Sequence, residues 1–147
     1  MGAWGTKVFE DDLSFDWYDE FCESDQSIEK LENAFEDVIE TEDYLDHEFG
    51  IAALVSAELL AAALGAPSED FPKEDYHQGE DGDDPLPLLN LGRIREDIDA
   101  ELVEKARKAV KKVGHFSHSE IRELWEESDS YEEWLRTLSE LIERLKM

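Results

Sequence analysis

The feature that most constrains this chain is an apolar run, IAALVSAELLAAAL, which spans residues 51–64 and ends at Gly65. Glu58 is its single charged residue. A helix that is apolar on nearly all sides must be buried on all sides. The run is too short to cross a bilayer, which needs about 20 apolar residues. It therefore predicts the central helix of a soluble domain, with amphipathic helices packed around it.

Hydrophobic spacing predicts such helices before the run. A first helix is expected from Asp11 or Asp12, because a carboxylate there can accept hydrogen bonds from free backbone N–H groups. A second is expected from Ile28 through Leu45, after a break at 24–27. The glycine-rich opening is compatible with a short extended piece over Thr6–Phe9.

The last third of the chain is also predicted to be helical. Apolar residues from Leu102 to Val113 share one face, and Lys105, Lys108, Lys111 and Lys112 occupy the opposite one. Ser117 with Glu120, and Ser130 with Glu133, have the spacing of capping boxes that begin two further helices. The fold class predicted for the whole chain, 1–147, is a single all-α domain of about six helices. A loop rich in proline and acidic residues is expected at about 66–92.

Each of the four tryptophans of the chain could lie either in the core or at an interface with a partner. Trp125 and Trp134 lie at helical spacing and are expected in the core. Trp4 and Trp17 lie beside the most acidic helices, and both interpretations stay open for them, because aromatic residues are also common interface anchors. Cys22 lies on an apolar face among acidic residues, which predicts a raised pKa and a core position.

Charge is the most unusual property of the composition. The chain has 40 acidic and 14 basic residues, a net charge of −26. Residues 1–50 hold 17 acidic and 2 basic residues, whereas residues 101–147 hold 11 and 9. Direct binding of nucleic acid or of an anionic membrane is not expected, since both need Lys and Arg.

A basic protein surface is the natural partner of such a charge. The leading hypothesis is an acidic interaction protein, of the inhibitor or immunity type, and one version of it is mimicry of nucleic acid. The alternatives are a metal-dependent enzyme that uses the acidic loop, and a housekeeping protein whose charge serves solubility only. The residues expected to bind the partner are acidic ones of the second helix and of the loop: Glu29, Glu32, Glu36, Asp37, Glu40, Asp43, Glu80, Asp81, Asp83 and Asp84.

Catalytic residues, cofactors and a metal site are not predicted. His115 and His118 lie three residues apart, but a zinc site needs three or four ligands. Cys22 is the single cysteine and excludes an internal disulfide. With no signal sequence at its start, the chain is expected to be cytoplasmic.

Two stretches together resemble a known family. The opening MGAWGTKVFEDD and the late SEIRELWEESDSYEEWLRTLSELIERL are similar to an uncharacterised family of small acidic bacterial proteins. Its members begin M-G-x-W-G, followed by Phe and Asp, and carry an S-E-L-x-E-L-W-E-E-like helix near the end. The resemblance implies a bacterial or phage cytoplasmic origin. It implies no activity and no catalytic residues.

Overall fold

The computed structural model describes residues 5–72 and 89–146, and this part of the chain is all-helical. The predicted fold class is therefore confirmed, with seven helices in the described residues where about six were expected. In chain order they are α1 (Asp12–Glu23), α2 (Ile28–Glu40), α3 (His47–Ala63), α4 (Leu91–Glu96), α5 (Ala100–His115), α6 (Glu120–Glu126) and α7 (Tyr131–Arg144).

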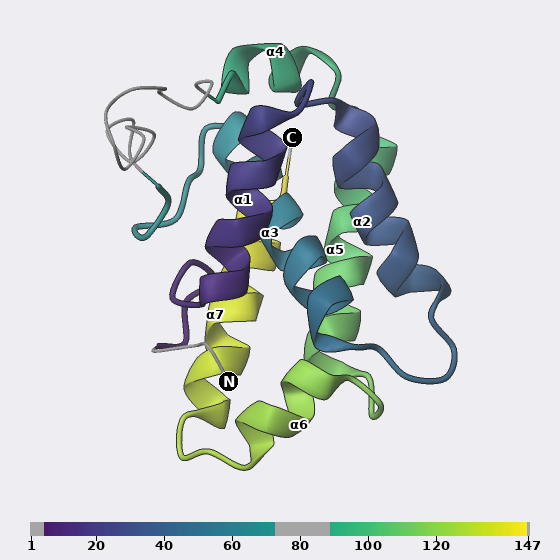
Figure 1. The fold of residues 1–147 in the computed structure, drawn as a ribbon, viewed down its shortest axis with the longest axis vertical. Coiled ribbons are helices and arrows are strands. Elements are labelled where there is room, and N and C mark those ends of the chain that lie inside the picture. Colours follow the sequence, from purple (N-terminus) through teal and green to yellow (C-terminus); the bar gives the residue numbers. More distant parts are fainter. Residues whose placement is uncertain (1–4, 73–88, 147) are drawn as a thin grey trace.

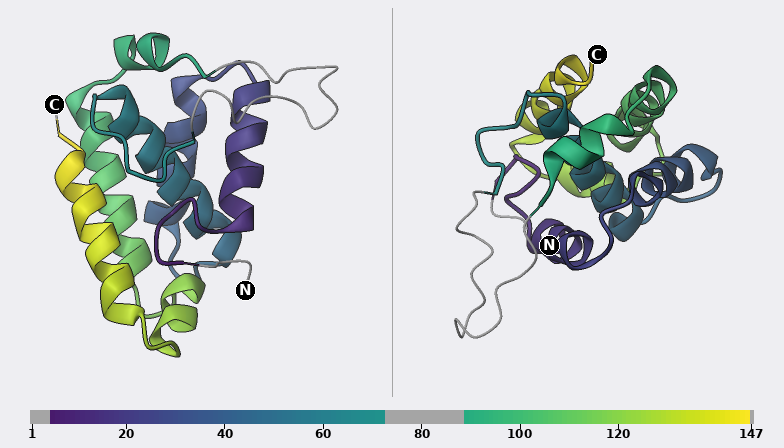
Figure 2. Two further views of the ribbon diagram at one scale, coloured as in Figure 1. Left: turned by 90° about the vertical axis from the view of Figure 1, so that its left-hand side faces the viewer. Right: turned by 90° about the horizontal axis from the view of Figure 1, so that it is seen from above.

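The predicted central helix is α3. It contacts each of the six other helices, and the view from above in Figure 2 shows it surrounded by them. In Figure 1, α1 and α2 lie on either side of it, with α6 at one end and α4 at the other. Thirteen of its 17 residues are buried. Ala53, Ala57 and Ala61 are wholly inaccessible, which fits the close approach that small side chains allow.

Both ends of α3 are capped, and the helix ends just before Gly65, as the sequence predicted. The carboxylate of Asp46 accepts a hydrogen bond from the N–H of Phe49 at 2.9 Å. At the other end Gly65 takes a φ of +94° and donates to the carbonyl of Ala62, while Ala66 donates to that of Ala61. This pair of bonds is a Schellman motif, which needs a left-handed residue and therefore favours glycine.

Replacing Gly65 with alanine is expected to destabilise the protein by about 1–2 kcal/mol, because alanine is strained at positive φ. A Cβ at this position would meet nothing within 4 Å, so the loss would come from the backbone alone. The matched control is Gly92→Ala in α4, where helical geometry should make alanine stabilising by about 0.5–1 kcal/mol. Urea unfolding of both variants measures the difference. Equal effects would contradict a backbone origin.

The segment before α1 is a turn that docks on the core, and the extended piece proposed for Thr6–Phe9 is not present. The N–H of Glu10 donates to the carbonyl of Lys7, and the N–H of Phe9 donates to the carboxylate of Asp70. A local turn carbonyl and a side-chain carboxylate thus accept the backbone N–H groups that a strand would donate to a neighbouring strand. The side chain of Phe9 is 1% exposed. Trp4 lies outside the described residues.

The second helix ends earlier than predicted. α2 stops at Glu40, and Leu45 lies in a separate extended segment. The N–H of Leu45 donates to the carbonyl of His118, and its own carbonyl accepts from the N–H of Glu120, both at 2.9 Å. Leu45 is still fully buried. The apolar spacing therefore predicted the burial of Leu45 correctly. The backbone of Leu45, however, bonds to the distant residues His118 and Glu120, and the helix does not continue to this position.

The C-terminal helices occur where predicted, although the cap of α6 differs. Its N-cap is Ser119, whose hydroxyl accepts from the N–H of Arg122, so the capping box proposed at Ser117 is wrong. The carboxylate of Glu120 instead accepts a hydrogen bond from the N–H of His47 in α3, at 3.1 Å. Ser130 is the N-cap of α7, but its side chain makes no capping bond.

The two tryptophans of these helices are core residues, as predicted. Trp125 and Trp134 are 8% and 3% exposed and stack with ring centroids 6.1 Å apart. Cys22 is also in the core, and burial raises the pKa of its thiol to about 11. A thiol with a raised pKa is a poor nucleophile near neutral pH, because the thiolate is the reactive form.

The loop expected at 66–92 ends in a helix that the sequence did not suggest. α4 begins at Leu91 after Asn90, whose side chain accepts from the N–H of Arg93. Its six residues are too few to show a hydrophobic period. Phe71, Leu89 and Leu91, near the two ends of this loop, pack against the core. Within the described residues, no helix is long and apolar enough to cross a membrane.

Candidate functional site

The predicted acidic face of α2 is divided by the packing of α5. The ammonium of Lys105 lies 3.3 Å from the carboxylate of Glu32 and 2.9 Å from that of Glu36. Lys112 donates to the carbonyls of Ile39 and Thr41 at the end of α2. Lys105 therefore neutralises part of this acidic face, and Lys112 binds the backbone at its end, so the basic helix α5 packs directly against the acidic helix α2.

The other predicted partner-binding residues are scattered. Glu29, Glu40 and Asp43 are exposed, and Asp37 lies on the opposite edge of α2 from Lys105, facing α1 and α3. The remaining four, which belong to the loop, lie outside the described residues: Glu80, Asp81, Asp83 and Asp84. Of the six that the structure describes, only Asp37 lines the groove described next.

This groove lies between α1, α2 and the first turns of α3, and its volume is about 420 Å³. We call it the α1–α3 groove. α1 supplies one wall, α2 the other, and the start of α3 the third side. Its lining residues are Trp17, Glu20, Phe21, Lys30, Asn33, Ala34, Asp37, Glu48, Phe49 and Ala52.

A smaller depression of about 280 Å³ continues the α1–α3 groove along α1. The two share Trp17, Glu20 and Glu48, and the smaller one adds Leu13, Asp16 and Ile51. Its four α1 residues recur at helical spacing, so they lie along one edge of that helix. The combined surface is thus an elongated strip with an apolar floor.

Two aromatic side chains give the groove its character. Phe49 is 45% exposed, although it begins the most apolar helix of the protein. Trp17 is half-buried and stacks on Phe21, with ring centroids 5.6 Å apart and planes 10° apart. The sequence left the role of Trp17 open, and the structure places it in the groove wall. The pattern that could have revealed Phe49 is a large aromatic residue that directly follows His47 and Glu48, just before the apolar run begins.

Four carboxylates surround the groove in the described part of the chain. No hydrogen bond or ion pair within the described chain engages the side chains of Asp16, Glu20, Asp37 or Glu48. The one basic side chain in the lining, Lys30, lies 3.3 Å from Asp25 at the start of α2. The groove is therefore aromatic, net negative and uncompensated, in contrast to the neutralised edge of α2 that faces α5.

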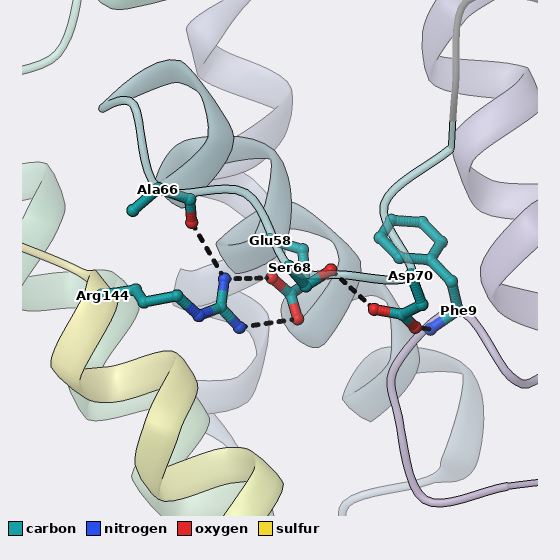
Figure 3. Close-up of polar contacts among 6 residues, drawn as sticks. All are labelled: Phe9, Glu58, Ala66, Ser68, Asp70 and Arg144. Atoms are coloured by element: carbon teal, nitrogen blue, oxygen red, sulfur yellow. Dashed lines mark hydrogen bonds and ion pairs between the residues drawn. The ribbon is translucent and has the colours of Figure 1, made fainter.

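A second polar cluster lies at the far end of α3 (Figure 3). The guanidinium of Arg144 holds both carboxylate oxygens of Glu58, at 2.7 and 3.1 Å, and also donates to the carbonyl of Ala66. Glu58 is 1% exposed, and burial raises its pKa although Arg144 opposes the shift. Nearby, Asp70 accepts bonds from Ser68 and from the backbone of Phe9. Each of these acids already has a partner, so the cluster joins chain segments.

A third polar contact joins α1 to α3. The carboxylate of Asp11 caps α1 and lies 3.6 Å from the Nε2 of His47. Burial would raise the pKa of Asp11, but the contact with His47 and the N–H of Leu13 outweigh it and lower that pKa. Across the described residues, no three His, Cys, Asp or Glu side chains are grouped so as to hold a metal ion. The α1–α3 groove is therefore the strongest candidate site.

A family model described as "Domain of unknown function (DUF4259)" matches residues 2–137. The chain belongs to this family. This confirms the expected membership of an uncharacterised family, and the α1–α3 groove lies within the matched part of this DUF4259 chain. Comparison with curated proteins gave no match, and comparison with solved structures gave none. The family description names no activity, and the α1–α3 groove is the feature of this chain that bears on its function.

Proposed function

We propose that this DUF4259 chain is an interaction protein that binds a basic protein partner in the α1–α3 groove. The observation that carries the proposal is the exposure of Phe49 in the groove that Trp17 also lines, where the acidic side chains have no partner among the described residues. Exposed aromatic surface bordered by uncompensated charge is typical of protein-binding sites.

Charge complementarity determines the class of partner. Asp16, Glu20, Asp37 and Glu48 give the groove surroundings a surplus of carboxylates. They lie within the most acidic third of a chain whose net charge is −26. A potential of this sign accelerates encounter with a basic surface and disfavours acidic ones. Inhibitor and immunity proteins are classes in which binding alone is the function.

The groove also favours a binding role for the acidic charge over a role in solubility only. Solubility requires only dispersed surface charge, and an exposed aromatic side chain works against it. Glu32 and Glu36, by contrast, are held by Lys105 and stabilise the packing of α2 on α5. We therefore expect these two glutamates to matter for stability and the groove carboxylates to matter for binding.

The test is capture of proteins from the native host lysate by the immobilised full chain and by two charge-matched variants. The groove variant carries Asp16→Asn, Glu20→Gln, Asp37→Asn and Glu48→Gln. The control neutralises four exposed acids of the C-terminal half, namely Glu101, Glu127, Asp129 and Glu132. We expect a basic protein that is captured by the wild type and the control, and at least about tenfold less by the groove variant, since each charge pair contributes a few tenths to 1 kcal/mol.

Salt and nucleic acid complete the experiment. Raising the salt concentration from about 50 mM to about 500 mM shortens the screening length severalfold and should weaken capture strongly. Competition by duplex DNA or RNA for the captured protein would favour nucleic-acid mimicry, whereas a captured complex that still binds nucleic acid normally would exclude it. Equal capture by both variants, insensitive to salt, would overturn the proposed function.

A further inference from the structure

We infer that the α1–α3 groove recognises an arginine side chain of the partner, seated against Phe49 and Trp17 and bonded to groove carboxylates. This inference rests on the proposed function and specifies the chemistry of the partner. It commits to a protein segment as occupant, with an arginine as its anchor.

The walls of the groove combine the two features that bind an organic cation. Aromatic faces attract a cation through their quadrupole, most strongly tryptophan. Glu20 and Glu48 line both depressions next to Trp17, and their carboxylates are without partners in the described structure. An aromatic residue alone would accept any apolar group, and carboxylates alone would accept any cation. Their combination selects a cation with a flat, weakly hydrated surface.

Arginine fits this requirement better than lysine. Its guanidinium is planar, stacks on aromatic rings and donates two parallel hydrogen bonds to a carboxylate. Lysine carries a compact and strongly hydrated charge, which loses more on leaving water. The chain itself contains the bidentate arrangement in its Arg144–Glu58 pair. A bare metal ion would find no ligands on the aromatic wall.

The extent of the groove indicates a polypeptide rather than a small free cation. The volumes of about 420 Å³ and about 280 Å³ adjoin at Trp17, and the smaller depression contains the apolar side chains of Leu13 and Ile51. One arginine side chain would fill only part of the larger one. We assign the smaller depression to an apolar side chain of the same segment, so that the partner presents an amphipathic stretch.

The experiment uses three synthetic peptides of about 15 residues, long enough for about four helical turns. They share an amphipathic leucine pattern and differ in their polar positions, which hold arginine, lysine or citrulline, the neutral isostere of arginine. Each is titrated into the full chain at low salt and followed by calorimetry and by the NMR signals of Phe49 and the Trp17 indole. We expect the arginine peptide to bind best, the lysine peptide less well and the citrulline peptide at least about tenfold more weakly.

Variants of Phe49 separate stacking from charge. Phe49→Leu keeps an apolar side chain but loses the ring, and it should weaken the arginine peptide about three- to tenfold and remove the preference over lysine. Phe49→Trp should preserve that preference. The control is Tyr44→Leu, because Tyr44 is 50% exposed but does not line the groove. Since Phe49 is exposed, its variants should fold normally.

The outcomes distinguish this inference from the proposed function. If both basic peptides bind alike and Phe49→Leu has no effect, while Glu20→Gln with Glu48→Gln weakens both, the arginine anchor is wrong and charge-based binding stands. If no peptide shifts the groove signals, the anchor is also wrong, and the capture experiment decides the proposed function. Tighter binding of spermidine than of the arginine peptide at the same signals would overturn the choice of a polypeptide.

Discussion

Leu60→Asp is expected to abolish folding. Leu60 is fully buried in the last turn of α3, the helix that contacts every other helix. An aspartate there would be charged without a partner, or neutral at the cost of a strongly shifted pKa. Loss of the leucine contacts alone costs about 2–5 kcal/mol. Together these terms approach the 5–15 kcal/mol that typically separates folded from unfolded domains.

Circular dichroism and NMR signal dispersion measure the outcome. Leu60→Met is the matched control, because a swap that conserves volume usually costs less than about 1.5 kcal/mol. Leu59, which is also fully buried, should behave in the same way when replaced with aspartate. A Leu60→Asp protein that melts cooperatively at the wild-type temperature would show that α3 is not buried in solution.

Arg144→Met is expected to cost about 3–5 kcal/mol, because it leaves the carboxylate of Glu58 buried without its counter-ion. Urea unfolding measures the loss. Arg136→Met, on an exposed position of the same helix, should change stability by less than about 0.5 kcal/mol. Combining Arg144→Met with Glu58→Leu should recover most of the loss, since an apolar pair can replace a buried ion pair. A double variant no better than Arg144→Met would contradict this origin.

The deficit of Arg144→Met should also depend on pH. Burial raises the pKa of Glu58 in the folded protein, and Arg144 opposes that shift. Between the unfolded pKa, about 4.3, and the raised folded value, the folded state binds more protons, so stability falls as the pH rises through this window. Removing Arg144 raises the folded pKa further and extends the window upward. We therefore expect a smaller deficit near about pH 5 than near about pH 8, and an equal deficit at both would contradict it.

The central helix was predictable because its pattern permits one placement. A run that is apolar on all sides has no face to leave in water, so burial follows from composition alone. The ends of this helix also depend on residues close by in the sequence, because Asp46 caps its own helix and Gly65 supplies a left-handed residue. The same holds for Trp125 and Trp134, whose helical spacing placed them in the core.

The candidate site was predictable only in small part. Asp37 was expected to contact the partner and Trp17 was left open between core and interface, and both line the α1–α3 groove. Glu20, Glu48 and Phe49 were not singled out. Nothing in a single helix distinguishes a carboxylate that will face a groove from one that will face a neighbouring lysine.

By itself, the sequence determined the all-helical class, most of the helices, which helix is central and how acidic the molecule is, because these depend on local pattern and on composition. Tertiary structure decided which charges remain uncompensated. Lys105 neutralises Glu32 and Glu36 from 73 and 69 residues away in the chain, whereas no basic side chain of the described residues pairs with the groove carboxylates. Since charges separated by less than a Debye length of about 8 Å interact strongly, the packing of α5 against α2 determines where the acidic field remains.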